Sequence, residues 1–168
     1  MSNPRMQIDE KDPIPHGIVF NYEHSEGIAQ YLIRFWPYLI YQGSRGPGSD
    51  DKILAEHGIS QVLAITNVTL PPIRTACRWI LPVDDGKGWT GEQVDFIKTF
   101  CEFSPDRDCT KLIHCDHGIS RSAGALIIWR MLFDNVDKIC AYEWVRRMNS
   151  GVNCRQEILD SIPERFHV

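Results

Sequence analysis

Apolar and polar positions change period several times along the chain, and these changes divide it into strand-length and helix-length segments. Mostly apolar runs of strand length occur at 38–41, 61–66, 78–81 and 111–114. Segments of helical periodicity separate and follow these runs, at 49–57, 91–101, 121–133, 137–148 and 155–162. Strands that alternate with helices predict an α/β fold, a single domain whose central, mainly parallel sheet is flanked by helices.

The first part of the chain shows neither period clearly. Residues 1–16 contain three prolines, and we expect them to lie as an extended arm on the surface. The sequence therefore divides into an N-terminal extension or arm over residues 1–30 and a folded domain over residues 31–168.

Charge and hydropathy argue against two classes of partner. The 168 residues carry a net charge of −4, the opposite of the balance that favours non-specific nucleic-acid binding. Residues 1–14 lack the apolar core of a signal peptide, and the longest apolar stretch, 123–133, is too short to cross a bilayer. We therefore expect a cytoplasmic protein with neither a nucleic acid nor a membrane as partner; the oligomeric state is left open.

Cysteine usage and local charge narrow the chemistry. None of the six cysteines forms a C-x-x-C pair, which favours a reduced compartment. His114, Cys115 and His117 are grouped but lack a matching second half, so we expect no metal site and no cofactor. From Arg121 to Arg155, six basic residues outnumber three acidic ones, and this net charge of +3 suits an anion-binding site.

Residues 114–124, His-Cys-Asp-His-Gly-Ile-Ser-Arg-Ser-Ala-Gly, join the last predicted strand to an apolar helix. In a tight strand-to-helix turn, backbone N–H groups converge without intrahelical partners, and the helix dipole adds partial positive charge. Gly118 permits a positive φ close to a bound oxyanion, and the planar guanidinium of Arg121 can bind two of its oxygens. Such a cradle favours the thiolate of Cys115, a nucleophile directed at phosphorus.

The spacing Cys-x5-Arg alone is weak support for this interpretation. Cys101 with Arg107 and Cys140 with Arg146 share the spacing, but their cysteines fall in predicted helices. The sequence context singles out Cys115, because it follows a buried strand and precedes a helix.

The loop resembles the signature H-C-x-x-G-x-x-R-S of the protein tyrosine phosphatase superfamily, with every fixed position filled. Flanking segments are similar to those of the small dual-specificity phosphatases, at 38–44, 58–66, 81–85 and 146–159. This resemblance implies that residues 31–168 form a dual-specificity phosphatase-like catalytic domain. The implied substrate is a phosphorylated protein or peptide, bearing phosphotyrosine and also phosphoserine or phosphothreonine.

The resemblance also implies individual roles. Cys115 would attack phosphorus to form a cysteinyl-phosphate, and Arg121 would stabilise charge on the phosphate oxygens together with the loop amides. Asp85 would give a proton to the leaving group and later take one from water. Ser122 would hydrogen-bond the sulfur, and His114 would orient the loop through its backbone.

The phosphate would be bound by the loop itself. The implied binding residues are Asp116, His117, Gly118, Ile119, Ser120 and Arg121. No lysine occurs among them, and the charge of Asp116 would repel additional phosphates, which argues against inositol phosphates as substrates.

Several alternatives remain. Asp84 is adjacent to Asp85 in a glycine-rich loop, although the family pattern favours the second of the two as the acid. The chain could be a catalytically silent phosphate-binding module, or a phosphatase of an RNA 5′-triphosphate, a glycan or an inositol phosphate. A rhodanese-like or arsenate-reducing enzyme would also hold a cysteine in an anion loop, but it does not fit the H-C…R-S context.

Overall fold

The computed structural model describes residues 14–25, 28–105 and 108–166. Within them, six strands form one sheet in the order β1-β2-β3-β6-β4-β5. The strands are β1 (His16–Ser25), β2 (Ile28–Trp36), β3 (Ile40–Gly43), β4 (Ile59–Ile65), β5 (Cys77–Leu81) and β6 (Thr110–His114). The helices are α1 (Arg45–Gly48), α2 (Asp51–Glu56), α3 (Gly91–Glu102), α4 (Arg121–Asp134), α5 (Lys138–Met148) and α6 (Gln156–Ser161).

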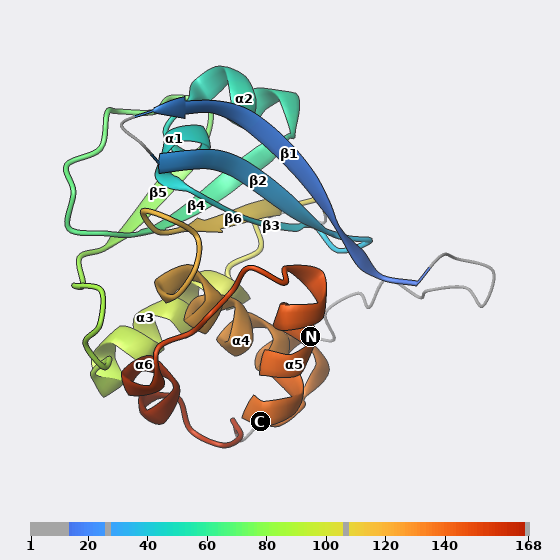
Figure 1. The fold of residues 1–168 in the computed structure, drawn as a ribbon, viewed down its shortest axis with the longest axis vertical. Helices are drawn as coiled ribbons and strands as arrows, with labels where there is room; N and C mark the ends of the chain where they lie inside the picture. The colour runs from blue at the N-terminus through green and yellow to red at the C-terminus, as the bar shows by residue number, and fades with distance from the viewer. Residues whose placement is uncertain (1–13, 26–27, 106–107, 167–168) are drawn as a thin grey trace.

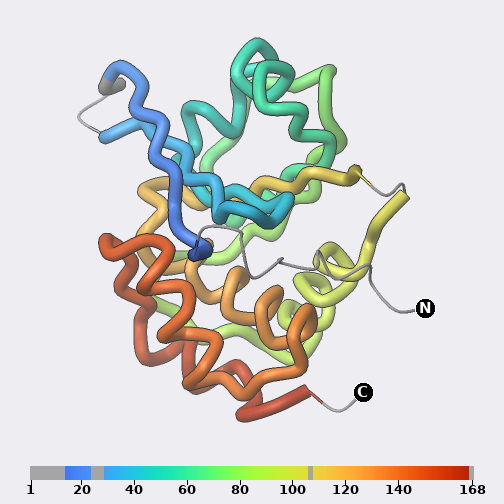
Figure 2. The backbone as a smooth tube through the Cα atoms, turned by 90° about the vertical axis from the view of Figure 1, so that its right-hand side faces the viewer, coloured from blue at the N-terminus to red at the C-terminus, as the bar shows by residue number. Residues whose placement is uncertain are grey.

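The sheet lies between two layers of helices. Helices α3 to α6 gather on one face and fill the lower half of Figure 1, whereas α1 and α2 lie above the other face. Figure 2 shows the same separation from the side. Because side chains alternate along a strand, β6 sends Leu112 into the smaller core near α2 and Ile113 into the larger core near α4.

The predicted α/β fold with a mainly parallel sheet is confirmed for β3, β6, β4 and β5. Each neighbouring pair among these four strands is parallel, so their carboxyl ends meet at one edge of the sheet. The central strand β6 is buried along its whole length. The segment that follows it therefore emerges at the sheet edge where ligands bind in open α/β folds.

The N-terminal part of the sheet corrects the predicted arm. Strands β1 and β2 form an antiparallel hairpin, and β2 pairs antiparallel with β3, so the sheet is mixed. Strand β2 is integral to the fold because it buries Leu32 in one core and Phe35 in the other. The expected boundary at residue 30 falls inside β2, and the remainder of the arm, residues 1–13, lies outside the described residues.

Helix α4 begins directly after the loop and is deeply buried. Residues 121–129 are all buried, as expected for a helix that is apolar all round. Trp129 stacks on Phe133 and Trp144, and Tyr38 meets all three rings edge-on. This aromatic cluster packs α4 against α5 and against the turn between β2 and β3, and thereby positions the helix.

Candidate active site

The turn between β6 and α4 has the conformation that the sequence predicts. Gly118 has a φ of +75°, a region that side chains rarely adopt. A Cβ added there would collide with the hydroxyl of Tyr31. That hydroxyl donates to the carbonyl oxygens of His117 and Gly118 at 3.0 and 2.9 Å, so β2 holds the turn from the side.

A buried glutamine supports the loop from below. The Nε2 of Gln42 donates to the carbonyl oxygen of Gly118 and to the Oγ of Ser122, both at 2.9 Å. Its Oε1 accepts from the Nδ2 of Asn149, also at 2.9 Å. Neither Gln42 nor Asn149 was predicted; the available signal was a polar residue directly after the apolar run 38–41.

Cys115 lies at the base of the pocket above this network. Its side chain is buried, and its Sγ lies 3.3 Å from the Oγ of Ser122, a contact that the family resemblance implies. Because this Oγ already accepts from Gln42, the hydroxyl hydrogen of Ser122 is available to the sulfur. The arrangement can stabilise negative charge on Cys115.

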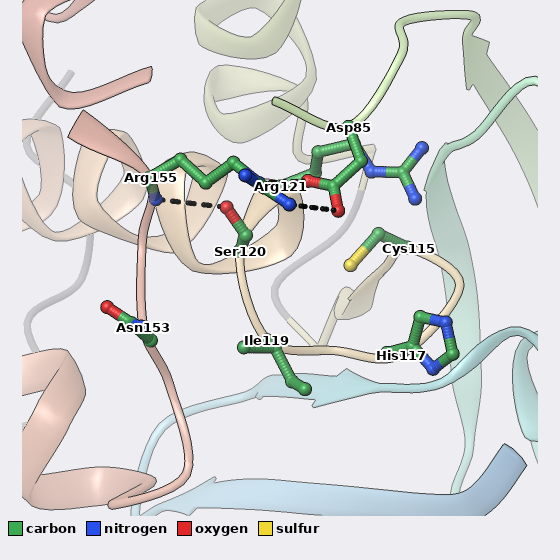
Figure 3. Close-up of a pocket in the computed structure, with 8 residues that line it drawn as sticks. All are labelled: Asp85, Cys115, His117, Ile119, Ser120, Arg121, Asn153 and Arg155. Atoms are coloured by element: carbon green, nitrogen blue, oxygen red, sulfur yellow. Dashed lines mark hydrogen bonds and ion pairs between the residues drawn. The ribbon is translucent and has the colours of Figure 1, made fainter. Parts of the chain in front are cut away.

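The pocket over the sulfur has a volume of about 330 Å³ (Figure 3). Its lining is formed by Asp85, Cys115, His117, Ile119, Ser120, Arg121, Asn153 and Arg155. Of the residues predicted to bind phosphate, Asp116 and Gly118 do not line it. The structure therefore brings the predicted sulfur, guanidinium and acid of positions 115, 121 and 85 to one cavity.

Arg121 is buried and held at two of its nitrogens. Nη1 donates to the carbonyl oxygen of Val83, and Nη2 forms an ion pair with Oδ2 of Asp116, each at 3.1 Å. Its buried Nε has no hydrogen-bond partner among the described residues. A buried donor in this position gains from an acceptor such as a phosphate oxygen.

Asp116 has a different place from the one its sequence position suggested. One carboxylate oxygen accepts from the Oγ1 of Thr66 at 2.6 Å, and the other pairs with Arg121. Partial burial raises the pKa of Asp116, but the hydrogen bonds from Thr66 and Arg121 outweigh it and hold that pKa below its usual value. Its charge is thus compensated, and the expected repulsion of additional phosphates loses its physical basis.

His114 is fully buried beside the loop. Its Nδ1 lies 3.4 Å from the carbonyl oxygen of Cys115, in line with the predicted orienting contact. Desolvation is the main reason that the pKa of His114 falls to about 4, so the ring is neutral at pH 7. Gly48 permits this packing, because a Cβ there would collide with the imidazole.

Of the two adjacent aspartates, Asp85 faces the pocket. Its carboxylate oxygens pair with Nε and Nη2 of Arg155, at 3.2 and 3.5 Å. Asp84 instead accepts from the amide of Asn67 and pairs with Lys87 at 3.4 Å. The geometry therefore favours Asp85 over Asp84 as the group that can act on a bound ligand.

Arg155 was not predicted as a site residue. It precedes α6, and its backbone N–H donates to the Oγ of Ser120 at 3.0 Å. Two residues earlier, the N–H of Asn153 donates to the carbonyl oxygen of Ile119, also at 3.0 Å. The segment 153–155 is thus hydrogen-bonded to the backbone of Ile119 and to the side chain of Ser120 in the phosphate loop. In the sequence, the only sign that Arg155 belongs to the site was the excess of basic residues toward the end of the chain.

The other cysteines differ from Cys115 in setting. All six are described and none is paired in a disulfide. Desolvation raises the pKa of Cys101 and of Cys154 to about 12, which keeps both thiols protonated. Cys140, one of the two other cysteines with the Cys-x5-Arg spacing, is exposed on α5.

Two kinds of site are absent from residues 14–25, 28–105 and 108–166. Across these residues, no group of three or more His, Cys, Asp or Glu side chains is arranged to hold a metal ion. In the same part of the chain, no helix has both the length and the apolar character that a membrane span requires.

Comparison with known proteins gives matches at the level of structure. No protein-family model matches the chain, and no curated protein matches it in sequence. Human DUSP28 matches with a TM-score of 0.65 and 17% identity, over 77% of this chain and 88% of that one.

Two further solved structures have similar scores. A mouse protein described as a dual specificity phosphatase and complexed with zinc tungstate has a TM-score of 0.66 and 16% identity, over 93% of this chain and 89% of that one. Human tyrosine phosphatase-like serine/threonine/tyrosine-interacting protein has a TM-score of 0.63 and 21% identity, over 73% and 87%. The chain therefore has the fold of the dual-specificity phosphatases.

Proposed function

We propose that this protein is a cysteine-dependent phosphatase that hydrolyses phosphotyrosine monoesters, with phosphoserine and phosphothreonine as further substrates. The observation that carries the proposal is one pocket in which a sulfur, a guanidinium and a carboxylate converge, from Cys115, Arg121 and Asp85. These three groups supply the nucleophile, the charge stabilisation and the proton donor that phosphoryl transfer to sulfur requires.

In the first step, the Cys115 thiolate attacks phosphorus as the bond to the leaving oxygen breaks. Arg121 contributes its unpartnered Nε, together with the N–H groups of the loop, to the charged phosphate oxygens. Protonated Asp85 transfers its proton to the leaving oxygen, so that an alcohol or phenol departs and a cysteinyl-phosphate remains. Asp85 has to leave Arg155 for this step, since both carboxylate oxygens are engaged in the ion pair.

In the second step, water attacks the cysteinyl-phosphate. Asp85, now a carboxylate, accepts the proton of that water, and the bond between sulfur and phosphorus breaks. The departing Cys115 thiolate receives the hydrogen bond of Ser122, whose oxygen lies 3.3 Å away. Inorganic phosphate is released and the thiolate is restored.

An aryl leaving group suits the mouth of the pocket. Ile119 lines the pocket and is 45% exposed, which provides an apolar surface for a ring. His117 lines the same cavity. Burial of an aromatic side chain against such a surface would favour phosphotyrosine over the shorter alkyl esters.

The proposal is tested by turnover of an aryl phosphate in the presence of a chelator. Cys115→Ser should lower kcat by about 10⁴-fold or more, because loss of a nucleophile removes the covalent route. Cys140→Ser is the matched control, because Cys140 has the same Cys-x5-Arg spacing but lies exposed on α5; it should retain full activity. Equal turnover by wild type and Cys115→Ser would refute the proposal.

A second candidate is a catalytically silent phosphate-binding module. The ion pair of Asp85 with Arg155 favours a silent module, because this ion pair engages the carboxylate that is proposed as the acid. One of the similar structures is also named a phosphatase-like interacting protein. A silent module would bind phosphate at Arg121. It would show no turnover of an aryl phosphate that depends on Cys115.

A further inference from the structure

We propose that Arg155 is a specificity-determining residue that binds a second phosphate group of the substrate, close to the phosphate held over Cys115. The inference rests on the proposed phosphatase function and extends its substrates to compounds that carry a second phosphate group. The preferred substrates carry two neighbouring phosphate groups, joined by one bridging oxygen or attached to nearby carbons. In the free protein, the carboxylate of Asp85 occupies the position of the second phosphate.

The backbone of Arg155 is fixed beside the phosphate loop. Its N–H donates to Ser120, and the N–H of Asn153 donates to Ile119, so the chain is tied to the loop at both places. From this base the side chain extends toward Asp85, and Figure 3 shows it among the residues around the cavity that contains Cys115. A ligand phosphate held over the sulfur would therefore have the Arg155 guanidinium at the side of the same cavity.

The charges in the pocket leave room for a second anion. Of the two arginines that line it, Arg121 is buried and shares its charge with Asp116. Arg155 pairs with Asp85 alone among the ion pairs found in the described part of the chain, and their side chains are 54% and 43% exposed. Such an exposed ion pair contributes little stability. A phosphate dianion, which accepts the same two N–H bonds with more charge, can replace the carboxylate.

This exchange would couple recognition to catalysis. When a second phosphate takes over Nε and Nη2 of Arg155, both oxygens of Asp85 are released. The released carboxyl group can then turn toward the leaving oxygen. A phosphate monoester without a second anion offers no replacement partner for Arg155, so the ion pair has to be broken without compensation.

The experiment compares inhibition of aryl phosphate turnover by three anions: inorganic phosphate, pyrophosphate and 1,3-propanediol bisphosphate. Wild type should bind at least one of the two bis-phosphates about tenfold more tightly than phosphate, since a charge-assisted bidentate contact is added. A preference for pyrophosphate would indicate a substrate whose two phosphates are joined as an anhydride. A preference for 1,3-propanediol bisphosphate would indicate a substrate with two separate phosphate esters. In Arg155→Gln the preference over phosphate should disappear, and Arg155→Lys should retain part of it.

Arg147→Gln is the matched control, because it removes the same charge from an exposed position on α5. It should keep the wild-type preference for the bis-phosphate. The inference is overturned if wild type binds all three anions equally, or if Arg147→Gln loses the preference as fully as Arg155→Gln.

Failure of the proposed function gives a different result. In that case wild type does not turn over the aryl phosphate, and the affinities of the same anions are measured by calorimetry instead. A preference that depends on Arg155 would then support the second phosphate position in a binding protein. A binding preference unchanged in Arg155→Gln would overturn it in either setting.

Discussion

The residues beneath the phosphate loop and those at the mouth of its pocket are held by different means. We define the floor as four buried side chains, those of Gln42, His114, Ser122 and Asn149. The rim is the pair Asp85 and Arg155, both more than 40% exposed and joined to each other by an ion pair. Hydrogen bonds join Gln42 to Ser122 and Asn149, and close packing in the interior holds His114, whereas solvent reaches both members of the rim.

This difference separates the two halves of the proposed chemistry. Leaving a buried polar group of the floor unpaired costs about 1–3 kcal/mol, so the position of the Cys115 sulfur is fixed before any ligand binds. Rearranging the exposed rim costs about 1 kcal/mol or less. Gly86, with a φ of +88°, directly follows Asp85 and adds freedom to its loop. The position of the nucleophile is thus fixed in the free protein, whereas the position of the acid can change when a ligand binds.

Between the floor and the rim, the larger expected effect comes from the rim, as a loss of activity without a loss of stability. Asp85→Asn should lower kcat for an aryl phosphate by about 10²–10⁴-fold, the usual contribution of a general acid. The free energy of unfolding should change by less than about 0.5 kcal/mol, since the side chain is exposed. Asp84→Asn is the matched control and should leave kcat within about twofold. Equal losses in both variants would show that the acid is misassigned.

The next effect in size is a pH dependence of the floor. The folded pKa of His114 is about 4 and the ordinary value is 6.5, so the unfolded chain binds the extra proton between these pH values. The free energy of unfolding should therefore fall as pH drops from 6.5 to 4, by about 3 kcal/mol from this group.

Chemical denaturation at several pH values measures this contribution. His114→Asn should flatten the pH dependence, whereas His16→Asn, at an exposed histidine, should leave the wild-type slope unchanged. Identical slopes for wild type and His114→Asn would contradict the burial argument.

A smaller effect is expected for the amide network of the floor. Gln42→Leu keeps the size of the side chain but leaves Asn149 without its acceptor and Ser122 without its amide donor. The carbonyl oxygen of Gly118 keeps only the hydrogen bond from Tyr31. The free energy of unfolding should fall by about 2 kcal/mol in urea denaturation. Activity should fall with it, which distinguishes the floor from the rim.

The exposed Gln156 on α6 provides the control for that variant. Gln156→Leu should change the free energy of unfolding by less than about 0.5 kcal/mol. If Gln42→Leu were as stable and as active as wild type, the floor would not be what positions the sulfur.

The elements that could be predicted from the sequence are those that a local pattern of residues encodes. The parallel strands follow from apolar runs, and the loop follows from a cysteine placed between a buried strand and a helix. The hairpin of β1 and β2 was missed because the residues from 16 to 36 mix polar and apolar types, and their burial is decided by strands formed later in the chain.

The support around the sulfur could not be predicted for a related reason. Gln42 and Asn149 are 107 positions apart, and no local period records that they meet. In the sequence, nothing distinguishes Arg155 from any other exposed arginine before a short helix. Its role depends on the position of α6 beside the loop, which only the fold determines. The charge of Asp116 was correctly noticed but wrongly taken to face the ligand, because its pairing with Thr66 depends on the neighbouring strand β4.

The most direct test of the central claim is to identify the atom that receives the phosphoryl group. Ser122→Ala should slow the second step, because the departing sulfur loses its hydrogen bond. This variant would be mixed with an aryl phosphate, quenched rapidly, digested and analysed by mass spectrometry. We predict one phosphoryl group on the peptide that contains Cys115, attached to its sulfur. Phosphate release with no phosphorylated cysteine at any time, or a phosphoryl group on another residue, would contradict the account.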